Sequence, residues 1–174
     1  MGARGAVIMG FFGAVFAALT MHLQWRVLGL MLALPFVVFL AIAAAALHTM
    51  RLKGNGVVLS QATKKALMWS SIGEGIGIFL ASNVVANLHR DDLLLPAIAL
   101  VVGLHFLPIA RAASFRPFCV LGAVLLASAI IGFLVGAPVG GEIAGIAAAS
   151  SLWLASLAAI RRDWQEKRAS LSFG

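Results

Sequence analysis

The chain has 174 residues, of which 62% are hydrophobic and 11% charged, and its formal net charge is +7. A soluble domain of this length could not bury so much apolar surface, because its surface-to-volume ratio is too high. The composition therefore excludes a soluble globular enzyme, a disordered tail and a disulfide-rich secreted module. It predicts an integral membrane protein, whose first and most extensive partner is the lipid bilayer.

Six apolar runs approach the length of about 20 mostly apolar residues that a membrane-spanning helix needs. In chain order they cover residues 5–22, 27–47, 66–88, 93–110, 118–136 and 139–160. Ser60 is a candidate N-cap, so the third helix is expected to begin before its apolar run. Pro117 and Pro138 fit the first turns of the last two helices. The predicted fold is an all-α bundle of six transmembrane helices in a single domain, with the first run retained rather than cleaved.

The basic residues indicate how such a bundle lies in the membrane. With six spans, one side holds both termini and the second and fourth connections, and that side carries eleven of the thirteen lysines and arginines. Only Arg26 and Arg90 fall on the other side. Because cytoplasmic loops are enriched in Lys and Arg, both termini are expected in the cytoplasm. The basic clusters do not alternate with aromatic residues as on a nucleic-acid-binding surface, so no nucleic-acid partner is expected.

Glu74 and His105 are the two titratable residues expected deepest in the apolar runs. Glu74 lies 15 residues before His89, and His105 lies 15 residues after Arg90, on either side of a short turn. Helices joined by so short a turn pack antiparallel, and the two side chains should therefore lie at the same depth. An ionised carboxylate there is costly unless it is paired or hydrated. A proton-sharing site and a structural hydrogen bond between helices both fit this arrangement.

Two further residues extend this candidate site. Pro108 cannot donate to the carbonyl of Leu104, which leaves a polar backbone group free one residue from His105. Asn83 follows Glu74 by nine residues and therefore lies half a turn away from it on the helix surface. A helix that is polar on two opposite sides is poorly suited to face lipid. The helix at 66–88 is therefore expected at the centre of the bundle, with Asn83 lining a path.

Glu142 lies in the first turn of the last predicted helix. It either complements the positive end of that helix or belongs to the ion-binding site. The segment that begins at Gly141 matches the one that begins at Gly73 in the pattern G-E-x-x-G-I-x-x-A-S. This match suggests a weak inverted repeat of three plus three helices, as in many transporters. Rows of small residues four apart, such as Gly141, Gly145 and Ala149, predict close helix packing within the bundle or in a homo-oligomer.

The segment Gly103-Leu104-His105-Phe106-Leu107-Pro108 resembles a G-x-H-F-x-P segment in small bacterial multi-pass membrane proteins that contain domains of unknown function. The resemblance covers mainly the fourth predicted helix. It implies a location in the bacterial inner membrane and gives weight to His105 and Pro108. It implies no particular activity.

The common hydrolase and nucleotide-binding motifs are absent from the sequence, and we expect no enzymatic activity, no cofactor and no metal site. Two hypotheses remain. The first is a small transporter or permease-like protein that handles protons or a solute through Glu74, His105 and Asn83. The second is a non-catalytic accessory or assembly subunit that binds another membrane protein, with the same polar pair holding helices together.

Overall fold

The computed structural model describes residues 2–172, and this part of the chain contains helices and no strands. The long helices are α1 (Ala3–Leu23), α2 (Leu34–Arg51), α3 (Gln61–Asn87), α4 (Leu94–Ala113), α5 (Arg116–Val135) and α6 (Val139–Ser172). Two short 3-10 helices, η1 (Gly29–Ala33) and η2 (Asp91–Leu93), precede α2 and α4. The all-helical class predicted from the sequence is confirmed.

Several helix starts follow from local chemistry. The hydroxyl oxygen of Ser60 accepts a hydrogen bond from the backbone N–H of Thr63 at 3.1 Å. This N-cap satisfies a backbone donor that the first helical turn leaves free. It explains why α3 begins five residues before its apolar run. Pro35 and Pro117 occupy the first turns of α2 and α5, where a missing N–H costs nothing.

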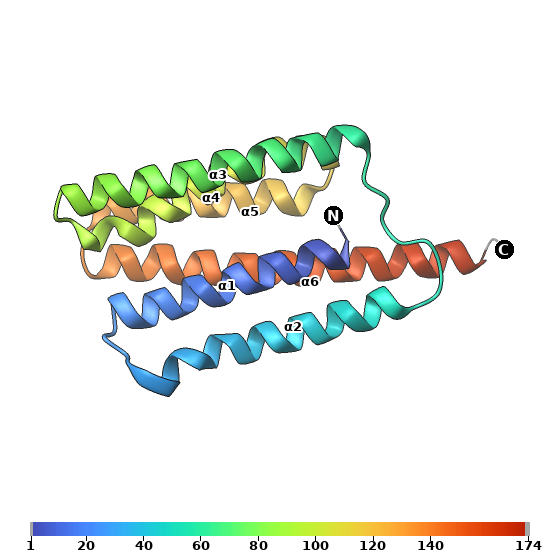
Figure 1. The fold of residues 1–174 in the computed structure, drawn as a ribbon, viewed down its shortest axis with the longest axis horizontal. Coiled ribbons are helices and arrows are strands. Elements are labelled where there is room, and N and C mark those ends of the chain that lie inside the picture. The colour runs from blue at the N-terminus through green and yellow to red at the C-terminus, as the bar shows by residue number, and fades with distance from the viewer. Residues whose placement is uncertain (1, 173–174) are drawn as a thin grey trace.

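The last helix is longer than predicted, and α6 continues twelve residues past the expected span. The extension packs against the connection between α2 and α3 (Figure 1). The side chain of Lys167 donates to the carbonyls of Met50 and Leu52 at 3.0 and 2.9 Å, and Asp163 accepts from the N–H of Val57 at 2.8 Å. The extension therefore binds the end of α2 and the loop after it.

Four helices, α1, α4, α5 and α6, form the apolar core, and α2 and α3 lie at its two edges (Figure 1). The core contains Met9, Phe16, Leu95, Val102, Phe106, Ile109, Phe118, Leu121, Leu125 and Leu152, with alanines of all four helices. α3 packs against α4 and buries only Thr63 and Val85. The prediction that α3 is central is therefore wrong. The alanine-rich α6 takes that place, because small side chains allow it to approach several helices closely.

Glycines mark the closest contacts between helix backbones. A Cβ atom added at Gly132 of α5 would lie 2.8 Å from the carbonyl oxygen of Gly140, at the start of α6. One added at Gly145 would collide with the buried hydroxyl of Thr20 on α1. The small residues of α1 and α6 thus serve packing within the bundle, as expected. In α3 only Gly77 is used in this way, since an added Cβ would lie 2.8 Å from Val101 Cγ1 of α4, whereas Gly73 has no neighbour within 4 Å.

The proposed repeat between α3 and α6 is not supported by their surroundings. α6 contacts α1, α2, α4 and α5, whereas α3 packs mainly on α4. Glu74 lies in the middle of α3, whereas Glu142 lies in the first turn of α6. Helices related by an inverted repeat would occupy equivalent positions, so the short sequence match does not extend to the fold.

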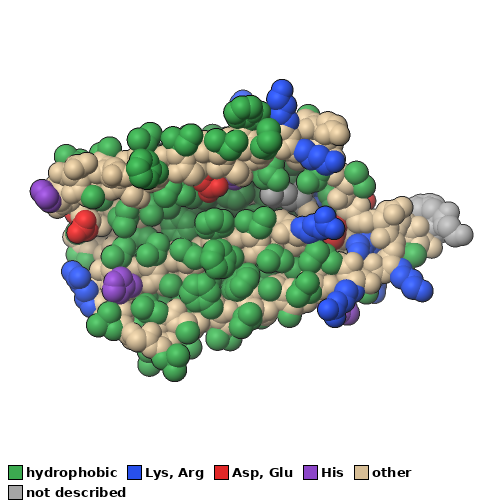
Figure 2. Space-filling view, viewed as in Figure 1, with side chains coloured by type: hydrophobic (Ala, Val, Ile, Leu, Met, Phe, Trp, Pro, Cys, Tyr) green, Lys and Arg blue, Asp and Glu red, His purple; other side chains and the backbone are tan. Residues whose placement is uncertain are grey.

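The two ends of the bundle differ in charge. The N-terminal end of α1, the α2–α3 and α4–α5 connections and the extension of α6 lie at one end (Figure 1), where most of the basic side chains seen in Figure 2 gather. Within residues 2–172, five helical segments are long and apolar enough to cross a membrane: α1, η1 with α2, η2 with α4, α5 and α6. α3 is not among them, because polar and glycine residues lower its hydropathy. An integral membrane protein is thus compatible with the fold, and the count of six spans stays a prediction.

The importance of glycine contacts can be tested with a matched pair of substitutions. We expect Gly132→Ala to lower the free energy of unfolding by about 1–3 kcal/mol, because the new methyl group would clash with backbone atoms of α6. Gly73→Ala should leave it unchanged or raise it by about 0.5–1 kcal/mol, because Gly73 faces open space and alanine favours the helix. Unfolding of the purified protein in mixed micelles measures both. Equal effects would contradict a close contact between α5 and α6 at Gly132.

Candidate functional site

Glu74 of α3 and His105 of α4 meet near the middle of the bundle. Nδ1 of His105 lies 3.4 Å from Oε2 of Glu74, and the two side chains are 8% and 15% exposed, respectively. The equal depth predicted from the turn between the helices is confirmed. The contact has the distance of an ion pair without the alignment of a hydrogen bond, and Nδ1 is buried with no hydrogen-bond partner among residues 2–172.

The local packing of α3 on α4 explains the contact. The turn after α3 is closed by Arg90, whose guanidinium donates two hydrogen bonds of 2.9 Å to Asp92. One turn from Glu74, Gly77 lies so close to α4 that an added Cβ would be 2.8 Å from Val101 Cγ1. At the far end of α3, the hydroxyl of Thr63 donates to the carbonyl of Ala112 at 2.8 Å. These contacts fix the distance between the helices on either side of the pair.

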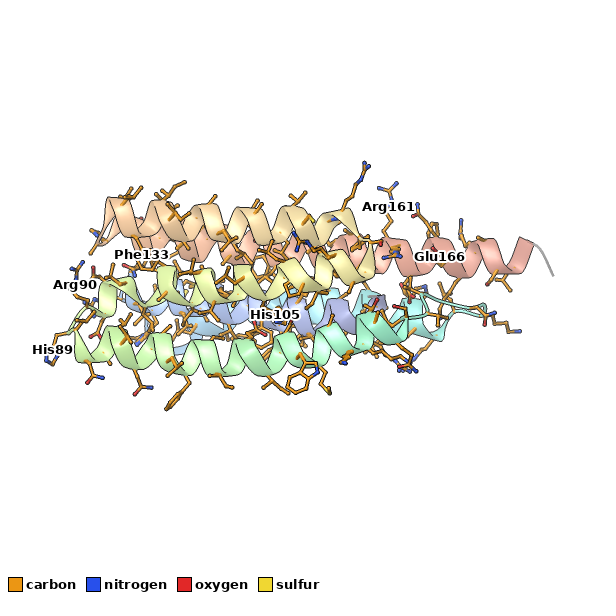
Figure 3. The ribbon with its side chains drawn as sticks, turned by 90° about the horizontal axis from the view of Figure 1, so that it is seen from above. His89, Arg90, His105, Phe133, Arg161 and Glu166 are labelled. Atoms are coloured by element: carbon orange, nitrogen blue, oxygen red, sulfur yellow. The ribbon has the colours of Figure 1, made fainter. Side chains whose placement is uncertain are left out.

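A cleft of about 350 Å³ contains the pair. It lies between α1 and α3, with α4 and α6 behind, and is lined mainly by apolar residues: Ile8, Met9 and Phe12 of α1, Leu67 and Ile78 of α3, Val102 and Phe106 of α4 and Leu152 of α6. In Figure 2 an acidic side chain (red) is visible among hydrophobic ones in the recess beneath α3. Figure 3 shows His105 at mid-length of the bundle. Two titratable groups thus share a mostly apolar cleft.

A second cavity, of about 470 Å³, adjoins this cleft toward the basic end of the bundle. The two share Gly5, Ile8 and Leu67 in their linings, which makes them neighbours along α1 and α3. Polar side chains line the second cavity: Arg4, Lys64, Asp163 and Lys167. The Glu74–His105 pair therefore lies next to a polar cavity on the side where the basic residues gather.

Three residues predicted for the site lie elsewhere. Asn83 is exposed on the outer side of α3, where its Nδ2 donates to the carbonyl of Phe79 at 2.7 Å. Pro108 is exposed on α4 and does not line the cleft. Glu142 lies at the opposite end of the bundle and accepts a hydrogen bond of 3.0 Å from Trp25 Nε1. The sequence fixes their depth along each helix, but their distance from the cleft depends on helix rotation and packing.

Sequence analysis missed polar residues of the cleft and of the cavity beside it. Ser71 lines the cleft and lies three residues before Glu74, a spacing that places both on one helix face, and this signal could have identified it. Arg4 lines the neighbouring cavity and has no comparable signal, because that cavity forms only where the start of α1 meets the α2–α3 connection, α3 and the extension of α6. No group of three or more His, Cys, Asp or Glu residues suited to a metal ion occurs in the described part of the chain.

Comparison with known proteins found no match: no protein-family model, no curated protein and no solved structure is detectably similar to the chain. The resemblance carried by Gly103-Leu104-His105-Phe106-Leu107-Pro108 therefore stays a prediction. The geometry of the site brings a carboxyl group and an imidazole together in a mostly apolar cleft.

A double-mutant cycle tests whether this contact contributes to stability. Glu74→Gln and His105→Gln should show a coupling free energy of about 1 kcal/mol in unfolding, because each removes the partner of the other. Glu74→Gln combined with Asn83→Ala should be additive to within about 0.5 kcal/mol, since Asn83 bonds to its own helix. Additivity in the first pair would contradict an energetic contact between Glu74 and His105.

Proposed function

We propose that this protein is a small transporter that moves protons, or a solute together with protons, through the cleft between α1 and α3. The observation that carries the proposal is the 3.4 Å contact of Glu74 with His105 inside a mostly apolar cleft. A carboxyl group and an imidazole at this distance can share or pass on a proton. Ionisable residues within membrane helices are costly and commonly mark ion or proton pathways.

The position of Glu74 within its helix supports this proposal. Glu74 is the middle residue of the 27 in α3, so about 20 Å of helix separates it from either end. A group at that depth exchanges protons with water only through a hydrated route. The polar cavity lined by Arg4 and Lys64, which shares Gly5, Ile8 and Leu67 with the cleft, supports such a route from the basic end. Transport would further require an opening toward the other end, past Ile78 of α3.

We also propose that α3 crosses the membrane, which gives six spans with both termini in the cytoplasm of a bacterium and the chain in its inner membrane. α3 runs antiparallel to α4, whose apolar segment is long enough to span, and contacts it from Thr63 to the turn at Arg90. Because the polar residues of α3 include a carboxyl group paired with His105, their cost in lipid is reduced. The basic end would then face the cytoplasm.

Proton flux into proteoliposomes tests the transport proposal. Under an imposed pH gradient, the protein should carry protons, and Glu74→Gln should reduce the flux by roughly a hundredfold, as expected for a positioned proton-transfer group. His105→Ala should reduce it similarly. An entrapped pH-sensitive dye gives the measurement.

Glu142→Gln serves as the matched control. It also removes a carboxylate, but Glu142 lies in the first turn of α6, outside the cleft, where it contacts Trp25. Its flux should equal that of the unaltered protein. If Glu74→Gln and His105→Ala also leave the flux unchanged in folded protein, the transport proposal fails.

A second candidate function, an accessory or assembly subunit, is favoured by the open surface of α3. Ile72, Ile76, Phe79 and Leu80 are exposed, and Gly73 and Gly75 have nothing within 4 Å, which leaves room for a helix of another membrane protein. In that case the Glu74–His105 contact holds α3 in place. A stoichiometric partner that co-purifies with the protein, together with severe destabilisation by Glu74→Ala, would favour this function over transport.

The orientation of the spans can be tested with single cysteines in a Cys119→Ser background. Ser114→Cys and Asn55→Cys should react with impermeant maleimide only after the cytoplasmic side is opened, whereas His89→Cys should react in intact spheroplasts. The physical reason is that an odd number of crossings separates the two sets of connections. Labelling of Asn55→Cys and His89→Cys from the same side would exclude α3 as a span.

A further inference from the structure

Arg162 of α6 lies where the helix leaves the bundle, and part of its hydrogen-bonding capacity is unused. Its guanidinium carbon lies 4.7 Å from the centroid of the Phe115 ring, which holds the side chain against the α4–α5 turn. Its Nη1 atom is buried and has no hydrogen-bond partner among residues 2–172. Because a guanidinium group presents five donors that suit carboxylate or phosphate oxygens, an anion is the natural partner.

The neighbouring acidic residue does not supply that anion. Glu166 lies one turn further along α6 and lines a separate cavity with Arg162, but no ion pair joins the two. The ion pairs found in the described part of the chain, Arg90–Asp92 and Glu74–His105, lie elsewhere. Arg161 is exposed and likewise has no acidic partner there. Two adjacent arginines therefore carry uncompensated charge at this point of the surface.

The arginines lie at one end of a groove of about 720 Å³ between α6 and the α4–α5 turn. Its lining comprises Ser114, Phe115, Pro117, Leu157, Ala158, Arg161, Arg162 and Gln165. Leu157 and Ala158 precede the two arginines by one helical turn, so the lining changes from apolar to charged along the helix. The groove thus has apolar side chains toward the middle of the bundle and guanidinium groups toward its basic end.

The groove also lies at the level expected for lipid headgroups. Ser114 and Phe115 form the turn between two helices that are apolar enough to span, and α6 continues beyond this level into the extension. Figure 3 shows Arg161 at this end of the bundle, opposite His89 and Arg90. Since the boundary between hydrocarbon and water is where phospholipid phosphates lie, the charges of the groove and of the membrane surface are complementary.

We propose that this groove binds an anionic phospholipid. The phosphate would be paired with Arg161 and Arg162, and the start of an acyl chain would lie on Leu157 and Pro117. A free phosphate ion would satisfy the arginines equally well but would gain nothing from the apolar half of the groove. A lipid uses both halves, and the site is separate from the Glu74–His105 cleft.

Native mass spectrometry of the detergent-purified protein tests this site. The probes are phosphatidylglycerol and phosphatidylcholine with the same acyl chains. Phosphatidylglycerol should be retained preferentially, and Arg161→Gln and Arg162→Gln should each weaken its binding about fivefold, the usual effect of one basic residue at an anionic membrane surface. Phosphatidylcholine binding should not change, and excess inorganic phosphate should not displace the lipid.

Arg168→Gln is the matched control, since this arginine is on the same helix but stacks over Trp164, with 3.8 Å from its guanidinium carbon to the ring centroid, outside the groove. Ala158→Phe fills the groove without changing the charge and should also weaken phosphatidylglycerol binding. This variant tests the groove even if Arg162→Gln fails to fold. The proposal is overturned if Arg168→Gln weakens binding as much as Arg162→Gln. Unchanged binding in Ala158→Phe, or displacement by inorganic phosphate, would overturn it as well.

Discussion

The close approach of helix backbones at small residues is the constraint on which the rest of this structure depends. Lipid offers no hydrophobic drive for helices to associate, so packing at Gly132, Gly140 and Gly145 must hold the bundle together. It places α6 against α1, α4 and α5 and leaves α3 with α4 as its main neighbour. The cleft between α1 and α3 follows from that arrangement, because no helix fills the space.

Buried polar side chains in the bundle make contacts of two kinds. The buried hydroxyls of Thr20, Ser128 and Ser156 donate to carbonyls three or four residues earlier in their own helices, which needs no partner helix. Glu74 and His105 instead meet across two helices. A contact of this kind depends on where α3 lies relative to α4. It therefore fits both candidate functions, a proton-transfer site and a contact that holds α3 for a partner subunit.

The charged side chains at the basic end of the bundle make several different contacts. Lys167 and Asp163 of the α6 extension hold the α2–α3 connection, while Arg4 and Lys64 line the cavity beside the cleft. Arg161 and Arg162 line the groove for which we propose an anionic phospholipid. The excess of basic residues, which in the sequence indicates only the orientation of the chain, thus serves in the fold as helix contacts, as the lining of a cavity and as the lining of this groove.

The sequence by itself determined the all-helical class, the approximate limits of the helices and the equal depth of Glu74 and His105. These properties follow from apolar length and from a fixed rise per residue on either side of a short turn. Only the tertiary structure decided that α3 lies at the edge and that Asn83 and Pro108 face outward. The physical reason is that lipid and the bundle interior are similarly apolar, so hydrophobic periodicity does not reveal which face of a helix meets protein.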